Sequence, residues 1–149
     1  MKGFSMLEMI ITLVIISILT VIAAPNIKSV LALEQLNQSS SDLVQVLKKA
    51  QSRAILESKV ITVRIGTSTL EDENELSWTP SGSAYLRGSN SVIYVGRSGI
   101  LQLSETSTAY AGIKDYVICS VNAVNSRKIT FNRIGIVIDS GLREGCNAS

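Results

Sequence analysis

An uncharged, apolar run near the N-terminus constrains this chain of 149 residues more than any other feature. From Met9 to Ile27 there is no charged side chain. At about 1.5 Å per residue, a helix from Met6 to Ile27 can just cross the roughly 30 Å hydrocarbon core of a membrane. The rest of the chain has an ordinary globular composition, which favours one modest folded domain.

Two simple interpretations of this run leave residues unexplained. A secretory signal peptide is suggested by Ile22-Ala23-Ala24, which resembles the small-residue site where such peptides are cut. Pro25 would then follow the cut directly, and Glu8 would interrupt the apolar core of the signal. A plain membrane anchor fits the length, but a carboxylate at the centre of a membrane helix costs about 2.5–3.5 kcal/mol. Glu8 therefore points to a function.

A third interpretation accounts for Glu8. The sequence Gly3-Phe4-Ser5-Met6-Leu7-Glu8, followed by the uncharged run, resembles the N-terminal signal of type IV pilins and type II secretion pseudopilins. The resemblance implies that Lys2 is the charge of a short leader. It implies that a prepilin peptidase cuts after Gly3 and that Phe4 becomes the N-methylated N-terminus. Pro25 stands where many members of the family carry a proline that kinks the helix.

The resemblance also implies a role for Glu8. In the family, the corresponding carboxylate is thought to pair with the terminal ammonium of a neighbouring subunit during assembly. Here cleavage would create that ammonium at Phe4. Two buried charges of opposite sign offset each other's desolvation far better than either does alone.

Helical periodicity continues beyond Pro25. Apolar residues recur at the spacing of one helical face, and polar residues fill the positions between them. The recurring residues are Leu36, Leu43, Leu47, Ala50 and Ala54. We therefore predict one long helix to about Ser58, apolar in its first half and amphipathic in its second half.

After residue 59 the pattern changes to short apolar or alternating runs separated by Gly and Ser, which predicts strands and turns. The expected strands are Val60–Ile65, Leu76–Trp78, Val92–Val95, Ile100–Leu103, Tyr116–Val121, Arg127–Phe131 and Ile134–Ile138. A helix followed by strands implies an α+β fold, with the helix packed on an antiparallel sheet.

These patterns divide the chain into four parts. Residues 1–3 are the expected leader peptide, and residues 4–27 are the expected transmembrane and assembly helix. Residues 28–59 form the amphipathic helix that packs on the sheet. Residues 60–149 form a β-rich periplasmic domain.

Cys119 and Cys146 are the two cysteines of the chain. In an exported domain such a pair usually forms a disulfide, and two free buried thiols are the alternative. Minor pilins that are similar to FimU carry a C-terminal disulfide of this sort. Because the sequence has no histidine, the commonest general base and the commonest metal ligand are missing. We expect no metal site and no cofactor, and we predict that the protein is not an enzyme.

Two sets of charged residues are candidates for contacts with other molecules. The acidic segment over residues 71–75 is typical of a solvated turn, and a contact with a neighbouring subunit or a cation is the alternative. Arg127, Lys128, Arg133 and Arg143 are candidates for a weak contact with DNA or a partner. Scattered solubilising charges are the simpler interpretation, since the net charge is only +2.

The segment from Arg127 to Asp139 resembles the last β-hairpin of the GspH/FimT/FimU group of minor pilins and pseudopilins. Phe131 and Gly135 match that hairpin, whereas Asn132-Arg133 stands where proline is frequent. DNA-binding members carry a Gly-Arg-x-Arg motif. The nearest pattern here is Gly141-Leu142-Arg143-Glu144, in which the carboxylate subtracts from the positive charge that binds phosphates.

We therefore predict a minor pilin of the type IV pilus, most like FimU. It would prime pilus assembly with other minor pilins and the major pilin, and support twitching motility, adhesion and DNA uptake. One alternative is a GspH-type pseudopilin of type II secretion, and another is a FimT-type DNA-binding minor pilin of natural transformation. The expected location is the bacterial inner membrane, with a single span and a periplasmic C-terminal domain, and then the pilus tip.

Overall fold

The computed structural model describes residues 5–67, 72–88, 91–121, 125–132, 137–144 and 146. Within these ranges, the side chains of residues 22–26, 125 and 137–144 are not described. The elements, in chain order, are the helix α1 (Met6–Glu57) and the strands β1 (Ile61–Ile65), β2 (Glu75–Trp78), β3 (Ala84–Arg87), β4 (Ser91–Val95), β5 (Leu101–Gln102), β6 (Lys114–Ser120), β7 (Asn125–Phe131) and β8 (Val137–Glu144).

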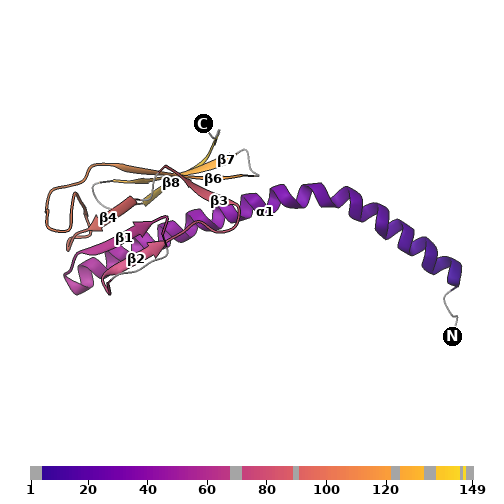
Figure 1. Cartoon of the computed structure of the whole chain (residues 1–149), viewed down its shortest axis with the longest axis horizontal. Coiled ribbons are helices and arrows are strands. Elements are labelled where there is room, and N and C mark those ends of the chain that lie inside the picture. The colour runs from indigo at the N-terminus through magenta and orange to yellow at the C-terminus, as the bar shows by residue number, and fades with distance from the viewer. Residues whose placement is uncertain are drawn as a thin grey trace.

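The helix α1 is long, and its two halves have different surroundings (Figure 1). Its second half lies along the strands, whereas its first half extends away from them. The helix ends at Glu57, and the left-handed backbone of its C-cap residue Ser58 (φ 52°, ψ 35°) redirects the chain toward β1, so the end predicted near Ser58 is confirmed. The helix runs through Pro25, and because that side chain lies outside the described part, the kink there stays a prediction.

The apolar face of the second half of α1 forms the centre of the core. Leu36, Leu43, Leu47, Ala50 and Ala54 are all fully buried, which confirms the face expected from the helical spacing. Complete burial of one leucine side chain contributes about 1.5–3 kcal/mol. Strand residues complete this core: Ile61, Val63, Ile65, Trp78, Ile93, Val95, Leu101, Tyr116, Ile118, Ile129 and Phe131.

The described strands form two four-stranded sheets, and α1 packs against both. The sheet with the order β2-β1-β4-β5 is called the mixed sheet here, because β2 runs parallel to β1. The sheet with the order β3-β6-β7-β8 is called the antiparallel sheet. One long helix packed against β-sheets is the α+β, pilin-like arrangement that the sequence predicted.

The parallel pairing of β1 and β2 departs from the purely antiparallel sheet expected from the sequence. Its register aligns Val63 with Leu76 and Ile65 with Trp78. All four of these side chains pack in or against the core cluster around α1. A shift of one residue would turn the apolar side chains of β2 to the opposite face, so burial of these pairs specifies the arrangement.

Two strands differ from the sequence-based expectation. The strand over Ala84–Arg87 is absent from the expected strands, because it is short and mixed in polarity, and it forms by pairing with β6. The expected last strand was Ile134–Ile138, whereas β8 covers Val137–Glu144, so that Gly141 lies inside a strand. Residues 133–136 lie outside the described part of the chain.

Candidate assembly segment

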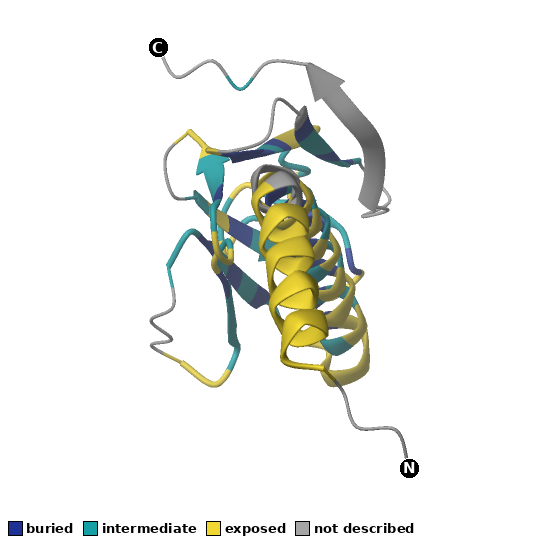
Figure 2. Cartoon of the chain, turned by 90° about the vertical axis from the view of Figure 1, so that its right-hand side faces the viewer, coloured by how far each residue is buried: buried dark blue, intermediate teal, exposed yellow. Residues whose placement is uncertain are grey.

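The described residues in the first half of α1 are exposed (Figure 2), and most of them are large and apolar. Their relative exposure lies between 50% and 84%. The residues are Met6, Leu7, Met9, Ile10, Ile11, Leu13, Val14, Ile15, Ile16, Ile18, Leu19 and Val21. A helix that is apolar on every side needs a cover, and an exposed apolar area of this extent marks an interaction surface. The described strands do not cover this surface.

Hydroxyl groups within this half are satisfied by the helix itself. Thr12 donates to the carbonyl of Met9 at 2.8 Å, and Ser17 donates to the carbonyl of Leu13 at 2.7 Å. Thr20 bonds in the same way to the carbonyl one turn before it. A hydroxyl that is already bonded inside the helix can be buried in apolar surroundings at little cost. These three hydroxyl residues are not among the sites predicted from the sequence, although polar residues within an apolar helical run are a readable signal.

Glu8 lies in the first turn of α1, three residues after Ser5. A carboxylate at this end is stabilised by the positive end of the helix dipole, typically by about 0.3–1 kcal/mol. The spacing from Ser5 is typical of a capping box, but the Ser5 side chain makes no capping hydrogen bond. The ion pairs found among the described residues do not involve Glu8. Its charge is therefore available to another molecule.

The expected cleavage site cannot be placed, because Gly3 and Phe4 lie outside the described residues. Cleavage between them and methylation of Phe4 stay predictions. The same holds for the leader over residues 1–3 and for the assembly role of Glu8.

A comparison with protein families matches residues 1–24 to the prokaryotic N-terminal methylation motif. The chain carries the N-terminal segment of a type IV pilin-like protein. The matched segment includes Gly3, Phe4 and Glu8, on which the resemblance to pilins rests. Comparisons of this pilin-like protein with curated proteins and with solved structures find no match.

The motif implies processing by a prepilin peptidase, and pilin-like proteins are typically structural proteins without enzymatic activity. Within the described part of this pilin-like protein, no helix offers a stretch long and apolar enough to cross a membrane. The expected span over residues 4–27 includes Phe4 and the side chains of residues 22–26, which are not described.

Cys119 and Cys146 form a disulfide, as predicted, with their Cα atoms 5.7 Å apart. Cys119 lies on β6 and is fully buried, and Cys146 follows the end of β8. Because β7 lies between β6 and β8, the bond ties the C-terminal segment across one intervening strand. The disulfide therefore holds the last strand of the antiparallel sheet to the body of the domain.

The basic residues of β7 do not form one surface. Arg127 and Lys128 are neighbours in a strand, so their side chains point to opposite faces of the antiparallel sheet. The guanidinium of Arg127 donates to Asn37 Oδ1 on α1 at 3.2 and 2.9 Å. Arg127 therefore faces the helix and helps to fasten it to the antiparallel sheet. Arg133 and the side chain of Arg143 lie outside the described part.

Lys128 is engaged on the outer face of the antiparallel sheet. Its Nζ lies 2.6 Å from Asp115 Oδ2, and Thr130 donates a hydrogen bond to Asp115 Oδ1 at 2.8 Å. The hydrogen bond from Lys128, followed by that from Thr130, holds the pKa of Asp115 below its usual value. The positive charge of Lys128 is therefore largely balanced within the sheet.

The described residues of the acidic segment over residues 71–75 lie in two different environments. Asp72 and Glu73 are exposed, as expected of a solvated turn, and residue 71 lies outside the described part. Glu75 instead belongs to β2 and pairs with Arg64 on β1 at 2.8 Å. Among the described residues, no group of three or more acidic or cysteine side chains could hold a metal ion.

A polar contact between α1 and the turn before β3 is absent from the sequence-based expectations. Gln35 Oε1 accepts hydrogen bonds from the backbone N–H and the hydroxyl of Ser83 at 2.9 and 2.8 Å. One turn further along α1, Ser39 Oγ accepts a hydrogen bond from the backbone N–H of Ser81 at 3.1 Å. Polar residues at positions bordering the apolar face of a helix are the only signal for such contacts in the sequence.

Proposed function

We propose that this pilin-like protein is a minor pilin of the type IV pilus, similar to FimU, that helps to prime pilus assembly. In this role it is cleaved after Gly3 and methylated at Phe4. Before assembly it is anchored in the inner membrane, with its β-rich domain in the periplasm. It then enters the pilus with other minor pilins and the major pilin, near the tip, and supports twitching motility, adhesion and DNA uptake.

The observation that carries the proposal is the exposed apolar half of α1 within a matched N-terminal methylation motif. An apolar surface that surrounds a helix on every side cannot be covered by one neighbouring sheet. It can be covered by lipid before assembly and by the helices of neighbouring subunits afterwards. The hydroxyls bonded within the helix at Thr12, Ser17 and Thr20 are compatible with both environments.

In the proposed filament, Glu8 forms an ion pair with the N-terminal ammonium of a neighbouring subunit. In the apolar bundle of a filament, an isolated carboxylate would be costly, and so would an isolated ammonium at Phe4. Pairing the two removes most of both costs and specifies the axial position of one subunit against the next. The ion pairs of the described residues leave Glu8 available for this contact.

A FimT-type role in DNA capture is less well supported. DNA binding needs several uncompensated cations on one surface, because affinity grows with the number of neutralised phosphates. Arg127 instead bonds to Asn37 on α1, and Lys128 pairs with Asp115. A pseudopilin of type II secretion would share the apolar half and Glu8, so only a cellular experiment separates it from a minor pilin.

Two measurements test the proposal. Mass spectrometry of the mature protein should find an N-methylated Phe4 at the N-terminus, and a chain that begins after Ala24 would rule out the pilin class. Deletion of the gene should reduce piliation and twitching motility while protein secretion stays normal. Loss of secretion with normal pili would instead identify a pseudopilin.

A further inference from the structure

Exposed apolar side chains continue along α1 to the point where the folded domain begins. Ile27, Val30 and Leu31 are 54%, 65% and 54% exposed. Ala32 is the first described residue of α1 that is buried, with 2% exposure. The exposed apolar surface of the first half of α1 therefore reaches the edge of the domain.

These apolar side chains share one face of the helix. Ile27, Val30, Leu31 and Glu34 are spaced three and four residues apart, which places them on the same side. Glu34 is exposed and begins a polar continuation of this face along the domain. The exposed polar residues that follow are Gln38, Ser41, Gln45 and Lys48. The outer face of α1 is thus suited to water along the domain, whereas its apolar part before Glu34 needs a different environment.

Glu8 and Lys28 stand at the two ends of the uncharged run, at a separation that fits a bilayer. No charged side chain lies between them, and α1 is continuous from one to the other. Lys28 lies 20 positions after Glu8, which corresponds to about 30 Å along a helix. The hydrocarbon core of a bilayer is also about 30 Å thick. When Glu8 lies at one membrane surface, Lys28 therefore lies at the other.

Lys28 has the chemistry of a contact with lipid phosphate. It is exposed, and the ion pairs found among the described residues do not involve it. It lies three residues before Leu31, so its side chain leaves the helix beside the apolar face. A lysine at the end of a membrane helix keeps its methylene groups in apolar surroundings and extends its ammonium to the interface. There the ammonium can donate charge-assisted hydrogen bonds to phosphate oxygens.

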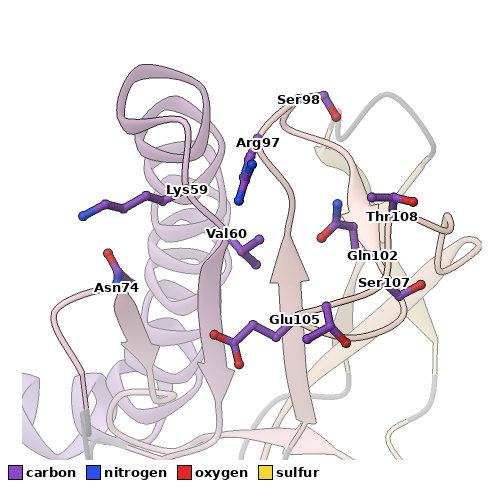
Figure 3. Close-up of a pocket in the computed structure, with 10 residues that line it drawn as sticks. Lys59, Val60, Asn74, Arg97, Ser98, Gln102, Glu105, Ser107 and Thr108 are labelled. Carbon is purple, nitrogen blue, oxygen red and sulfur yellow. The ribbon is translucent and has the colours of Figure 1, made fainter.

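The opposite end of the domain has a different surface. Lys59 and Val60 follow the end of α1 and line a cavity of about 740 Å³, whose other lining side chains are charged, amide or hydroxyl groups (Figure 3). Glu57, the last residue of α1, lies about 44 Å beyond Lys28 along the helix. A membrane surface at Lys28 would not reach this end. Leu56 is exposed there, so it can report on the absence of lipid.

We propose that Ile27, Lys28, Val30 and Leu31, called the interfacial face here, dock on the headgroup layer of a phospholipid bilayer before assembly. The ammonium of Lys28 donates to lipid phosphates, and the three apolar side chains lie at the border between hydrocarbon and headgroups. Because Ala32 is already buried in the domain, this contact holds the domain close to the membrane surface. The inference rests on the proposed membrane-anchored stage, and it adds a contact outside the hydrocarbon core that an anchor alone does not require.

The test places a tryptophan at three positions of the full chain, reconstituted in phosphatidylcholine vesicles. Ile18→Trp lies at the middle of the uncharged run, Leu31→Trp lies on the interfacial face, and Leu56→Trp lies at the opposite end of the domain. The lipids carry bromine either near the headgroup or near the end of the acyl chains, and bromine quenches a tryptophan that it contacts. Trp78 is buried in the domain, and the wild-type chain measures its contribution.

Leu31→Trp should be quenched mainly by bromine near the headgroup, Ile18→Trp mainly by bromine near the chain end, and Leu56→Trp by neither. If Ile18→Trp is quenched and Leu31→Trp is not, protein rather than lipid covers the interfacial face, and this inference alone fails. Quenching of Leu31→Trp mainly from the chain end, or equal quenching of Leu56→Trp, also overturns it. An unquenched Ile18→Trp overturns the anchored stage together with the inference.

Matched lysine variants test the phosphate contact. In the Leu31→Trp chain, Lys28→Gln should raise the ratio of chain-end to headgroup quenching about twofold, because the apolar face moves deeper when no ammonium holds it at the phosphates. Lys48→Gln, an exposed lysine in the polar part of the same face, should leave the ratio unchanged. An unchanged ratio in Lys28→Gln, or an equal change in Lys48→Gln, contradicts the contact. A circular dichroism melt confirms that each variant is folded.

Discussion

Gln35 of α1 lies directly over Gly82, in the space that a side chain at position 82 would fill. Gly82 has a positive φ of 63°, which glycine adopts without strain. The missing side chain and the positive φ at Gly82 let the turn before β3 pack closely against the helix. There Ser83 donates two hydrogen bonds to Gln35 Oε1. The pair therefore fastens α1 to the strand β3, which lies at an edge of the antiparallel sheet.

Replacement of Gly82 tests this contact. Gly82→Ala should lower the free energy of unfolding by about 2–3 kcal/mol, since it adds backbone strain and also pushes Gln35 away. Gly112→Ala is the matched control: its φ is 81°, but nothing lies within 4 Å of the added atom, so only the strain of about 1 kcal/mol applies. Urea denaturation of both variants gives the difference. Equal losses would show that the contact with Gln35 contributes nothing.

The ion pair between Arg64 and Glu75 joins the parallel strands β1 and β2 through bonds of 3.0 and 2.8 Å. Only 10% of the Glu75 side chain is exposed, so Arg64→Met leaves a largely buried carboxylate without this partner. We expect a loss of about 1–3 kcal/mol in the free energy of unfolding. Arg53→Met is the control, because its pair with Glu57 lies on the solvent-exposed surface of the helix, where water and salt screen the interaction. Similar losses in both variants would contradict the structural role of the buried pair.

Loss of the disulfide should destabilise the domain without affecting the N-terminal segment. In the chain-entropy description, a bond between residues 27 positions apart contributes about 3.5 kcal/mol. Cys146→Ser and Cys119→Ser should therefore lower the melting temperature by similar amounts. Treatment of the wild-type protein with a reductant should have the same effect, and the reductant should not change either variant. Membrane fractionation should show no change in the amount of inserted protein.

The pair between Asp115 and Lys128 makes a small, pH-dependent contribution to stability. Because the pKa of Asp115 is lowered in the folded state, the stabilisation is fully present above the unfolded pKa of about 3.9. It is lost as the pH falls through the lower pKa of the folded state. Asp115→Asn should therefore cost about 0.2–1 kcal/mol at pH 7, and the difference from wild type should vanish in strong acid. A difference that is independent of pH would show that charge is not the cause.

Glu8 should be needed for assembly rather than for insertion or cleavage. In the proposed filament, Glu8→Ala removes the counter-charge of the ammonium at Phe4, and breaking one side of a buried pair is strongly unfavourable. We expect incorporation into filaments to fall by about tenfold or more, while membrane insertion and processing stay normal. Glu34→Ala, an exposed carboxylate in the second half of the same helix, should assemble normally. Immunoblots of sheared pili and of membranes measure both steps, and normal incorporation of Glu8→Ala would refute the role.

Much of the fold is readable from local pattern. The buried face at Leu36, Leu43 and Leu47 follows from helical spacing, because a helix places every third or fourth residue on one side. The end of α1 near Ser58 follows from the change to alternating runs. The opposite orientations of Arg127 and Lys128 could also have been read from the sequence, since neighbours in a strand leave opposite faces.

The sequence by itself determined the class of this protein. Gly3, Phe4, Glu8 and the uncharged run that follows lie within one segment, so the methylation motif can be recognised without the rest of the fold. The disulfide was also predictable, because two cysteines in a chain that is expected to be exported usually form a bond.

Only the tertiary structure decided how distant segments meet. The parallel pairing of β2 with β1 and the fit of Gln35 against Gly82 each join residues far apart in the sequence. Two conditions determine such contacts. The apolar side chains must be able to pack together in the core, and the backbone must leave room for the neighbouring side chain. These are properties of the packed chain, and no short window of sequence contains them.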